Sequence, residues 1–319
     1  MITEEQSIFY LQTSTTSYVF RVNAFGHPEH IYYGAKIEPC ETESLRMKHS
    51  IAQGSAVLYN AKIDPAYCLD HVCLEWSGIG CGDFRQTPIE VRLMDGTYRT
   101  DFVYESYSIQ QGCIPMESLP SAYDDANEAQ TLALVLRDKP SNLKLTLYYT
   151  VFAGTDVITR RAVLENEGTG KVEIRRLMSM QVDLENEGFS LATFDGSWSK
   201  ETHRHDRKLQ YGQFVNSSVV GASSNRHNPG FFLYAEDATE SHGRVYGFNL
   251  IYSGNHFGLA ELSPNDLVRV QLGINPHCFD WQLKPGERFE TPEAVCTFSE
   301  HGFNGMSAHF HDFVNHHIV

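Results

Sequence analysis

The sequence predicts an all-β protein in which antiparallel sheets pack face to face. Short runs of alternating apolar and polar residues recur at roughly ten-residue intervals through the middle of the chain, with turn-forming residues between them. No helical pattern separates these runs, which argues against the alternating strands and helices of a parallel sheet. With 41% hydrophobic and 12% aromatic residues among 319, the chain can bury a large core, as one large domain or two ordinary ones.

The charge balance argues against anionic partners. The chain holds 25 Lys and Arg residues against 40 Asp and Glu residues, a net charge of −15, so nucleic acid and anionic membrane surfaces would repel it. The N-terminal segment MITEEQSIFYLQT does not resemble a signal peptide, and no apolar run approaches the roughly 20 residues of a membrane helix. We therefore expect no nucleic-acid and no membrane partner, while neutral ligands stay open.

The seven cysteines indicate a reducing compartment. Their number is odd, none belongs to a CxxC pair, and the spacing of Cys68, His71 and Cys73 fits no standard zinc site. We expect reduced thiols in a cytoplasmic protein, with no metal site and no cofactor.

The first 70 residues change character part-way. Residues 7–40 are rich in β-formers and are expected to form short strands. Residues 41–70 show little periodicity and contain a flexible stretch at 52–55 and a turn signal at 64–65. Such a stretch in a compact domain predicts either an extended functional loop, which could reach another subunit, or a surface loop.

The segment from Leu74 to Arg85 combines glycines with a charged pair. Three glycines in five positions permit tight turns or close backbone approach. Asp83 and Arg85 are two residues apart, so their side chains would share one face of an extended chain. Two roles fit this pair: orienting the hydroxyl groups of a ligand, or forming a structural ion pair that holds a turn.

From residue 89 to residue 182 the pattern predicts a series of strands. Residues 89–93 and 102–104 flank Asp95 and Gly96, which predicts a hairpin. A second hairpin is expected at 166–170, leading into strands at 172–174 and 178–182. Between the two hairpins, three further strands are expected at residues 132–136, 143–149 and 157–164.

A polar segment from Phe194 to Gly230 holds the candidate recognition residues. Trp198 follows Asp195-Gly196-Ser197 and is expected at a turn. Farther along, Asn225 and Arg226 belong to a polar loop that ends before the apolar run 231–233. A polar loop with a lone aromatic residue on a β scaffold is typical of a recognition site.

Two histidines in the same segment raise the question of a metal. His203 and His205 alternate and could face one way as ligands, but no third ligand lies at a suitable spacing. This pattern favours solvated histidines on a strand. At the C-terminus an amphipathic helix is expected, because side chains recur at helical spacing at Phe303, Met306, Phe310, Phe313, Val314 and His317.

Nine short fragments, spread over nearly the whole chain, form an ordered set. They are LEWSGIGCGDFR (74–85), YYTVFAGTDVITRR (148–161), LMSMQVDL (177–184), FDGSW (194–198), GASSNRHNP (221–229), YGFNLIYSGN (246–255), GINP (273–276), LKPGERFETPE (283–293) and GFNGMS (302–307). In this order they resemble the N-terminal domain of family 36 glycoside hydrolases, the microbial α-galactosidases.

The resemblance implies a large β-supersandwich over residues 1–300 and a linker helix over 301–319 that leads toward an absent catalytic (β/α)8 barrel. Retaining glycosidases use one carboxylate as nucleophile and another as general acid/base, and the resemblance implies that both are aspartates of the barrel. The chain alone is therefore expected to have no catalytic residue and to be inactive. The full enzyme would hydrolyse terminal α-galactosides of the melibiose and raffinose type.

For the binding residues, the resemblance implies that Trp198 walls the sugar pocket at the mouth of the active site. Asp83, Arg85, Asn225 and Arg226 lie in matching fragments and are further candidates for substrate contact. Full enzymes of the family are commonly tetramers, and in some members a loop from the region of 41–70 enters a neighbouring active site. Here Leu45-Arg46-Met47-Lys48-His49 replaces the motif of those members, so no ligand role is transferred to this loop.

Two hypotheses of other classes stay open. The chain could be a free-standing carbohydrate-binding β-sandwich, which would release heat on mixing with galactose, melibiose or raffinose. Alternatively, it could be a purely structural oligomerisation domain whose aromatic residues and C-terminal helix form an interface, which size-exclusion chromatography would reveal.

Overall fold

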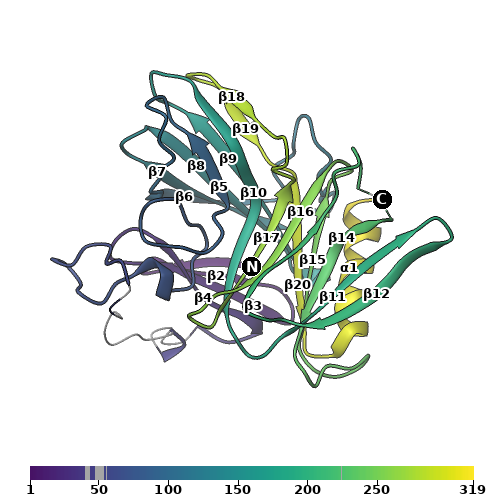
Figure 1. The fold of residues 1–319 in the computed structure, drawn as a ribbon. Coiled ribbons are helices and arrows are strands. Elements are labelled where there is room, and N and C mark those ends of the chain that lie inside the picture. The colour runs from purple at the N-terminus through teal and green to yellow at the C-terminus, as the bar shows by residue number, and fades with distance from the viewer. Residues whose placement is uncertain (40–43, 47–53, 55, 224) are drawn as a thin grey trace.

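The structure is a computed structural model of the chain and describes residues 1–39, 44–46, 54, 56–223 and 225–319. Within these residues the chain forms three antiparallel sheets, two short 3-10 helices and one α-helix (Figure 1). The predicted all-β class, with sheets packed against one another and a C-terminal helix, is confirmed.

The N-terminal sheet is a four-stranded meander. Its strands are β1 (Ile2–Glu5), β2 (Ile8–Gln12), β3 (Thr16–Val22) and β4 (Pro28–Ala35), paired in chain order. Phe20 of this sheet stacks on Phe9 at 4.8 Å between ring centroids and on Tyr149 of the next sheet at 5.3 Å. These contacts attach the N-terminal sheet to the main core.

The largest sheet has ten strands and carries both the regular middle of the chain and the Trp198 segment. Its strands are paired in the order β12-β11-β14-β15-β20-β9-β8-β7-β6, and β19 pairs with β9. The bounds are β6 (Val103–Gln111), β7 (Gln130–Asp138), β8 (Leu143–Phe152), β9 (Val157–Asn166), β11 (Ser190–Ser197), β12 (Lys200–Lys208), β14 (His227–Tyr234), β15 (Val245–Ile251), β19 (Arg288–Glu290) and β20 (Glu293–Ser299). The three strands predicted between residues 132 and 164 are therefore confirmed as β7, β8 and β9.

The third sheet has six strands and is organised around one long strand. β10 (Val172–Glu185) spans 14 residues and pairs with β17 along one half and with β5 and β18 along the other. The remaining bounds are β5 (Ile89–Arg92), β13 (Gly212–Ser217), β16 (His256–Leu262), β17 (Leu267–Ile274) and β18 (Trp281–Leu283).

Both hairpin predictions are wrong: the chain turns at both places, but the strands on either side of each turn do not pair with each other. At Asp95 and Gly96 the chain turns, with Gly96 at φ 85°, but β5 pairs with β10 and β6 pairs with β7. After residues 166–170, β9 and β10 likewise lie in different sheets. A turn signal reports that the chain reverses locally, whereas the partner of a strand is decided by which face can be buried. The run 177–184 is buried at every position, so β10 needs cover on both faces.

The main core lies where the sheets meet. Strands β7 and β8 point alternate leucines inward, and β10 contributes Ile174, Met180 and Val182 from the opposite side. Burying such a side chain stabilises the fold by about 1.5–3 kcal/mol. The alternation that predicted the strands is thus also what fills the space between the sheets.

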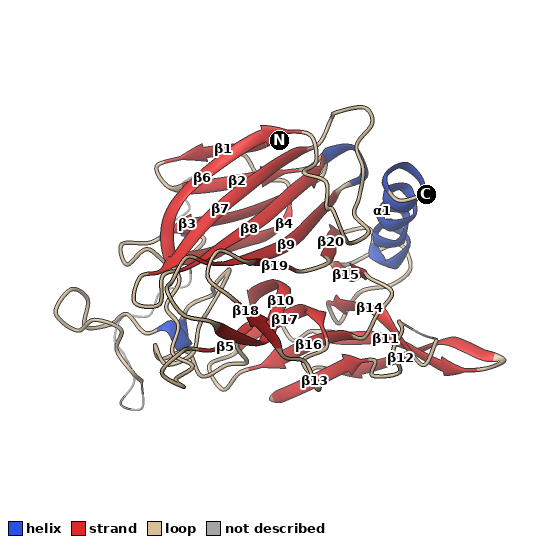
Figure 2. Cartoon of the chain, turned by 90° about the horizontal axis from the view of Figure 1, so that it is seen from above, coloured by secondary structure: helices blue, strands red, loops and turns tan. Residues whose placement is uncertain are grey.

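Helix α1 (Gly302–His317) packs along the ten-stranded sheet beside β15 and β20 (Figure 2). Phe313 contacts Phe152 at 5.0 Å between ring centroids, and Phe303 contacts Tyr234 at 5.0 Å. The predicted helix is confirmed, and its apolar face is used within the domain. Its role as a linker stays a prediction.

The two 3-10 helices are η2 (Leu69–His71) and η3 (Ala153–Thr155). Neither these nor the 16-residue α1 has the length and apolar character needed to cross a membrane, and this holds for every helix in the described part of the chain.

Candidate functional site

Strands β11 and β12 form a hairpin that projects from the ten-stranded sheet (Figure 1), and Trp198 lies at its tip. Strands β11 and β12 pair from Ser190 and Lys208 out to Ser197 and Lys200, and Trp198 and Ser199 form the turn between them. The predicted turn position of Trp198 is confirmed. Trp198 is 88% exposed, so both the face and the N–H of its indole are open to a ligand or to another protein surface.

Two residues allow this hairpin to close tightly. A Cβ on Gly196 would lie 2.1 Å from the carbonyl oxygen of Lys200, so no larger residue fits there. Ser199 adopts the left-handed region at φ 59°, and its N–H donates to Glu201 Oε1 at 2.8 Å. That hydrogen bond offsets part of the cost of the left-handed backbone and gives the Trp198 turn a defined shape.

Asp195 holds the base of the hairpin to the sheet. It lies opposite His203 in β12 and opposite His227 in β14. Its carboxylate accepts a hydrogen bond from Thr193 Oγ1 at 3.1 Å and lies 2.6 Å from His227 Nδ1. Directly opposed residues in neighbouring strands share a face, so the three side chains Asp195, His203 and His227 form one polar row beneath the tip.

The loop that carries Asn225 and Arg226 closes against the same hairpin. The N–H of Gly196 donates to the carbonyl oxygen of Arg226 at 3.2 Å, and Asn225 Nδ2 donates to Glu201 Oε1 at 3.5 Å. The structure therefore brings Trp198, Asn225 and Arg226 together at one hairpin, although about 27 residues separate them in sequence.

The outer strand β12 is exposed along its whole length, yet it is anchored on one side. The Arg204 guanidinium lies 4.0 Å from the ring centroid of Phe303 in α1, and its Nη2 lies 2.8 Å from Asp206 Oδ1. Partial burial raises the pKa of Asp206, but hydrogen bonds from Arg204 and Tyr234 lower it more, so the net pKa falls below its ordinary value. These contacts tie the hairpin to the helix.

Asp83 and Arg85 lie elsewhere, in a buried ion network with Asp183 of β10 and Arg269 of β17. Arg85 Nε lies 2.8 Å from Asp83 Oδ1, and Arg85 Nη1 lies 3.0 Å from Asp183 Oδ2. Arg269 Nη2 lies 2.8 Å from Asp83 Oδ2, and Arg269 Nε lies 2.7 Å from Asp183 Oδ1. Each carboxylate thus lies between two guanidinium groups, and the four charges cancel.

Burial favours a structural role for this network. All four side chains are at most 1% exposed, so a ligand could not reach them without local opening. Burial by itself raises the pKa of Asp83, but the charges of Arg269 and Arg85 lower it more, from 3.8 to about 2. Of the two roles that the sequence left open for Asp83 and Arg85, the structural ion pair has the support of this geometry.

A second buried charged cluster was missed from the sequence. Glu75 is fully buried, accepts hydrogen bonds from the hydroxyl groups of Tyr18 and Tyr149 at 2.7 Å each, and lies 3.0 Å from Arg160 Nη2. His30 Nδ1 lies 2.7 Å from the same carboxylate. Burial raises the pKa of Glu75, but Arg160 and His30 lower it more. The available signal was an arginine on the inward-facing side of an apolar strand, which requires an acidic partner.

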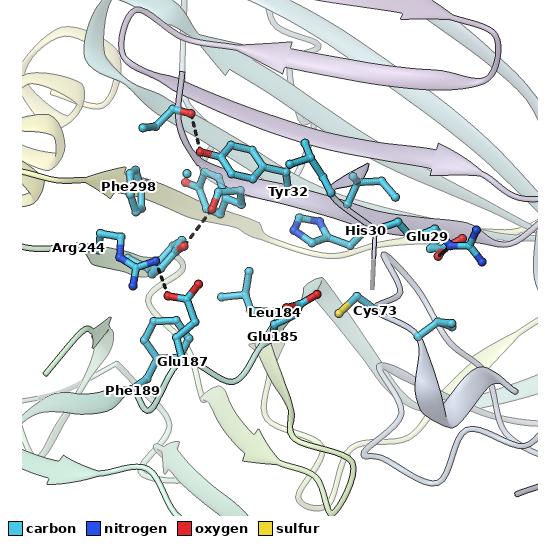
Figure 3. A pocket seen from close by; sticks show the side chains of 18 of the residues that line it. Glu29, His30, Tyr32, Cys73, Leu184, Glu185, Glu187, Phe189, Arg244 and Phe298 are labelled. Carbon is cyan, nitrogen blue, oxygen red and sulfur yellow. Dashed lines mark hydrogen bonds and ion pairs between the residues drawn. The ribbon is translucent and has the colours of Figure 1, made fainter. Parts of the chain in front are cut away.

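A cavity of about 280 Å³ lies next to this cluster. Figure 3 shows the ring of His30 and the Arg244–Glu187 ion pair in its wall. Arg46 also lines it, and Arg46 Nε lies 2.8 Å from Glu29 Oε1 of β4. The described part of the loop 41–70 therefore packs on its own sheet at this point. Residues 41–43, 47–53 and 55 of this loop lie outside the described residues, and contact of the loop with another subunit stays a prediction.

Possible metal ligands are dispersed in the described part of the chain. No three His, Cys, Asp or Glu side chains there are grouped in a way that could hold a metal ion. His203 and His205 are both exposed on β12. The six cysteines that the structure describes are all free thiols.

Comparison with known proteins gives a consistent result. The profile of the glycosyl hydrolase family 36 N-terminal domain matches residues 26–284. α-Galactosidase AgaA of Geobacillus stearothermophilus is 34% identical over 308 residues, which cover 95% of this chain and 41% of that protein. The crystal structure of the family 36 α-galactosidase AgaB from the same organism superposes with a TM-score of 0.95 at 33% identity, covering 100% of this chain and 43% of that one.

A crystal structure of AgaA with the substitutions A355E and D548N, in complex with raffinose, superposes with a TM-score of 0.94 at 33% identity and covers 98% of this chain and 43% of that one. This chain therefore spans less than half the length of the relatives that it matches.

Proposed function

Because this chain belongs to glycoside hydrolase family 36, as the N-terminal domain of its α-galactosidases, we propose that its Trp198 hairpin lines the mouth of the active site in the full enzyme. The chain itself would be the non-catalytic part. The full enzyme would cleave terminal α-galactosides of the melibiose and raffinose type, and the raffinose complex of a relative supports that substrate class.

The observation that carries this proposal is the 88% exposure of Trp198 at a turn whose geometry is fixed from both sides. A tryptophan offers 150–250 Å² of mainly apolar surface, and leaving it in water forgoes about 25 cal/mol for each Å². We therefore expect a ligand or another protein surface to cover this outward-facing indole in the functioning enzyme.

Sugar is a suitable cover for an indole. The ring face can lie against the apolar C–H patch of a galactose unit, while the indole N–H donates a hydrogen bond to a hydroxyl group. Asn225 and Arg226 lie beside the same hairpin and would add polar contacts. Asp83 and Arg85 would act indirectly, by holding the segment before β5 onto β10 and β17.

Kinetics of the full enzyme test the proposal. Trp198→Ala should raise KM for raffinose by about tenfold, equivalent to about 1.4 kcal/mol, whereas Trp198→Phe should keep an aromatic face and most of the affinity. An unchanged KM together with a lower Tm of the Trp198→Ala enzyme would instead assign Trp198 to packing between domains.

The other parts of the proposal concern the chain as a whole. We expect the purified 319-residue chain to release no galactose from an aryl α-galactoside, and activity that survives repeated purification would contradict this.

We also propose a cytoplasmic location, supported by the six free cysteines in the described residues, and a contribution to oligomer assembly. A purely structural role for α1 as an interface is less favoured, because Phe303, Met306 and Phe313 are already buried against its own sheet.

A further inference from the structure

A second aromatic site lies in a cleft between residues 117–119 and the segment that carries strands β18 and β19. The cleft has a volume of about 620 Å³, which is within the range of small-molecule binding sites, about 300–1,000 Å³. Its aromatic wall is made of Tyr252, Phe279, Trp281 and Phe289. Trp281 lies between two of the fragments that resemble a known family, 273–276 and 283–293, and nothing in the sequence there indicated a cleft.

Three of the four aromatic side chains pack on the core, and the fourth, Trp281, is half-exposed. Phe289 lies 5.3 Å from Trp281 and 5.7 Å from Phe279 between ring centroids, with interplanar angles of 56° and 65°. Tyr252, Phe279 and Phe289 are partly buried and pack on the main core, while Trp281 is 49% exposed. The core therefore fixes the orientation of a half-exposed indole.

Polar groups surround this wall at different depths. Glu290 is deepest, with its carboxylate 2.7 Å from Arg161 Nη1 and its side chain 19% exposed. Arg288 and Glu117 lie at the rim, 60% and 89% exposed. Asn255 Oδ1 accepts a hydrogen bond from the N–H of Gly221 at 2.7 Å, which orients the amide and leaves its Nδ2 hydrogens available to a ligand.

This combination fits a neutral sugar better than the other ligand classes. A pyranose presents an apolar C–H face to an indole, and its hydroxyl groups can both donate to carboxylates and accept from amide and guanidinium groups. An anionic ligand would meet Glu117 and Glu290 in a chain of net charge −15. A fully apolar ligand would cover these polar groups without pairing them, which is unfavourable.

We propose that this cleft is a second sugar-binding site, which takes one neutral hexose unit of an oligosaccharide against Trp281. The site is separate from the Trp198 hairpin and does not depend on the role proposed for it. Residues close in sequence touch both regions: Gly221 lines the cleft, and Asn225 Nδ2 donates to Glu201 Oε1 of the hairpin. A long oligosaccharide held at one site would therefore be retained close to the other.

The test uses the 319-residue chain and raffinose as the probe, followed by calorimetry and tryptophan fluorescence. We expect saturable binding in the millimolar range. Trp281→Ala should weaken it at least tenfold, and Trp281→Phe should weaken it less. The control is Tyr211→Ala, at an exposed aromatic residue outside both regions, which should leave it unchanged. Circular dichroism of each variant checks that the fold is kept, which is expected because Trp281 is half-exposed.

Three results would overturn the proposal. The first is the absence of binding at a raffinose concentration of about 100 mM, at which a site with a millimolar Kd would be nearly saturated. The second is loss of binding in Trp198→Ala but not in Trp281→Ala, which would leave the role proposed for Trp198 intact. The third is a full enzyme in which Trp281→Ala lowers the Tm while the chain alone binds no raffinose, because the cleft would then be a contact between domains.

Discussion

The buried ion network and the Trp198 hairpin use the same kinds of side chain for opposite purposes. In the network, Asp83, Arg85, Asp183 and Arg269 are at most 1% exposed. In the hairpin, Arg204 and Asp206 also lie 2.8 Å apart, but their side chains are 33% and 43% exposed. Distance alone does not separate the two regions, whereas burial does.

The difference matters because water screens charge. A pair near the surface interacts weakly and can exchange its partners for a ligand or for solvent. A buried set of charges is strongly coupled, and removing one member leaves another without compensation. The network is therefore suited to fixing the fold, and the hairpin to recognition.

The largest expected effect comes from breaking the network. Asp183→Asn keeps the size of the side chain but leaves two guanidinium groups facing one carboxylate, and it should lower the free energy of unfolding by about 3–5 kcal/mol. The matched control is Asp206→Asn in the hairpin, where the loss should stay below about 1 kcal/mol. Urea unfolding of both variants measures the difference. Equal losses would remove the distinction between the two regions.

A smaller effect is expected in acid. The pKa of Asp83 falls from 3.8 to about 2 on folding, so between these pH values the unfolded chain binds more protons and stability rises with pH. The contribution is fully present above about pH 4 and is lost as pH falls toward 2, and it amounts to about 2 kcal/mol at most.

Asp83→Asn should therefore flatten the dependence of the urea midpoint on pH between about 2 and 4, while other carboxylates keep their part of it. If this variant does not fold, an NMR titration of the Asp83 carboxyl carbon in the unaltered chain gives the same information. A titration midpoint near the ordinary value would contradict the coupling described for the network.

The smallest effect is expected at the tip of the hairpin. Trp198→Ala in the isolated chain should change the free energy of unfolding by no more than about 0.5 kcal/mol, because its side chain is exposed and the shape of the turn depends on Gly196 and Ser199. Chemical unfolding of the chain alone measures it. A loss above about 2 kcal/mol would mean that Trp198 is buried in solution, and the contrast with the network would fail.

Local patterns in the sequence predicted the regular elements well. The alternation in β7, β8 and β9, the helical spacing in α1 and the turn at Trp198 all depend on neighbours within a few residues, and each is confirmed. The ordered fragments also predicted the family and the class of fold. These features share one property: the information that specifies them is contiguous along the chain.

By itself, then, the sequence determined the strands, the helix, the exposed turn of Trp198 and the family. Only the tertiary structure decided that β5 and β6 separate into different sheets, that Asp83 and Arg85 meet Asp183 and Arg269, and that Phe279, Trp281 and Phe289 face a cleft. The physical reason is that burial is a property of the packed molecule. Asp83 and Asp206 are the same residue type, each two residues from the arginine that it pairs with, and only the strands packed around Asp83 remove it from water.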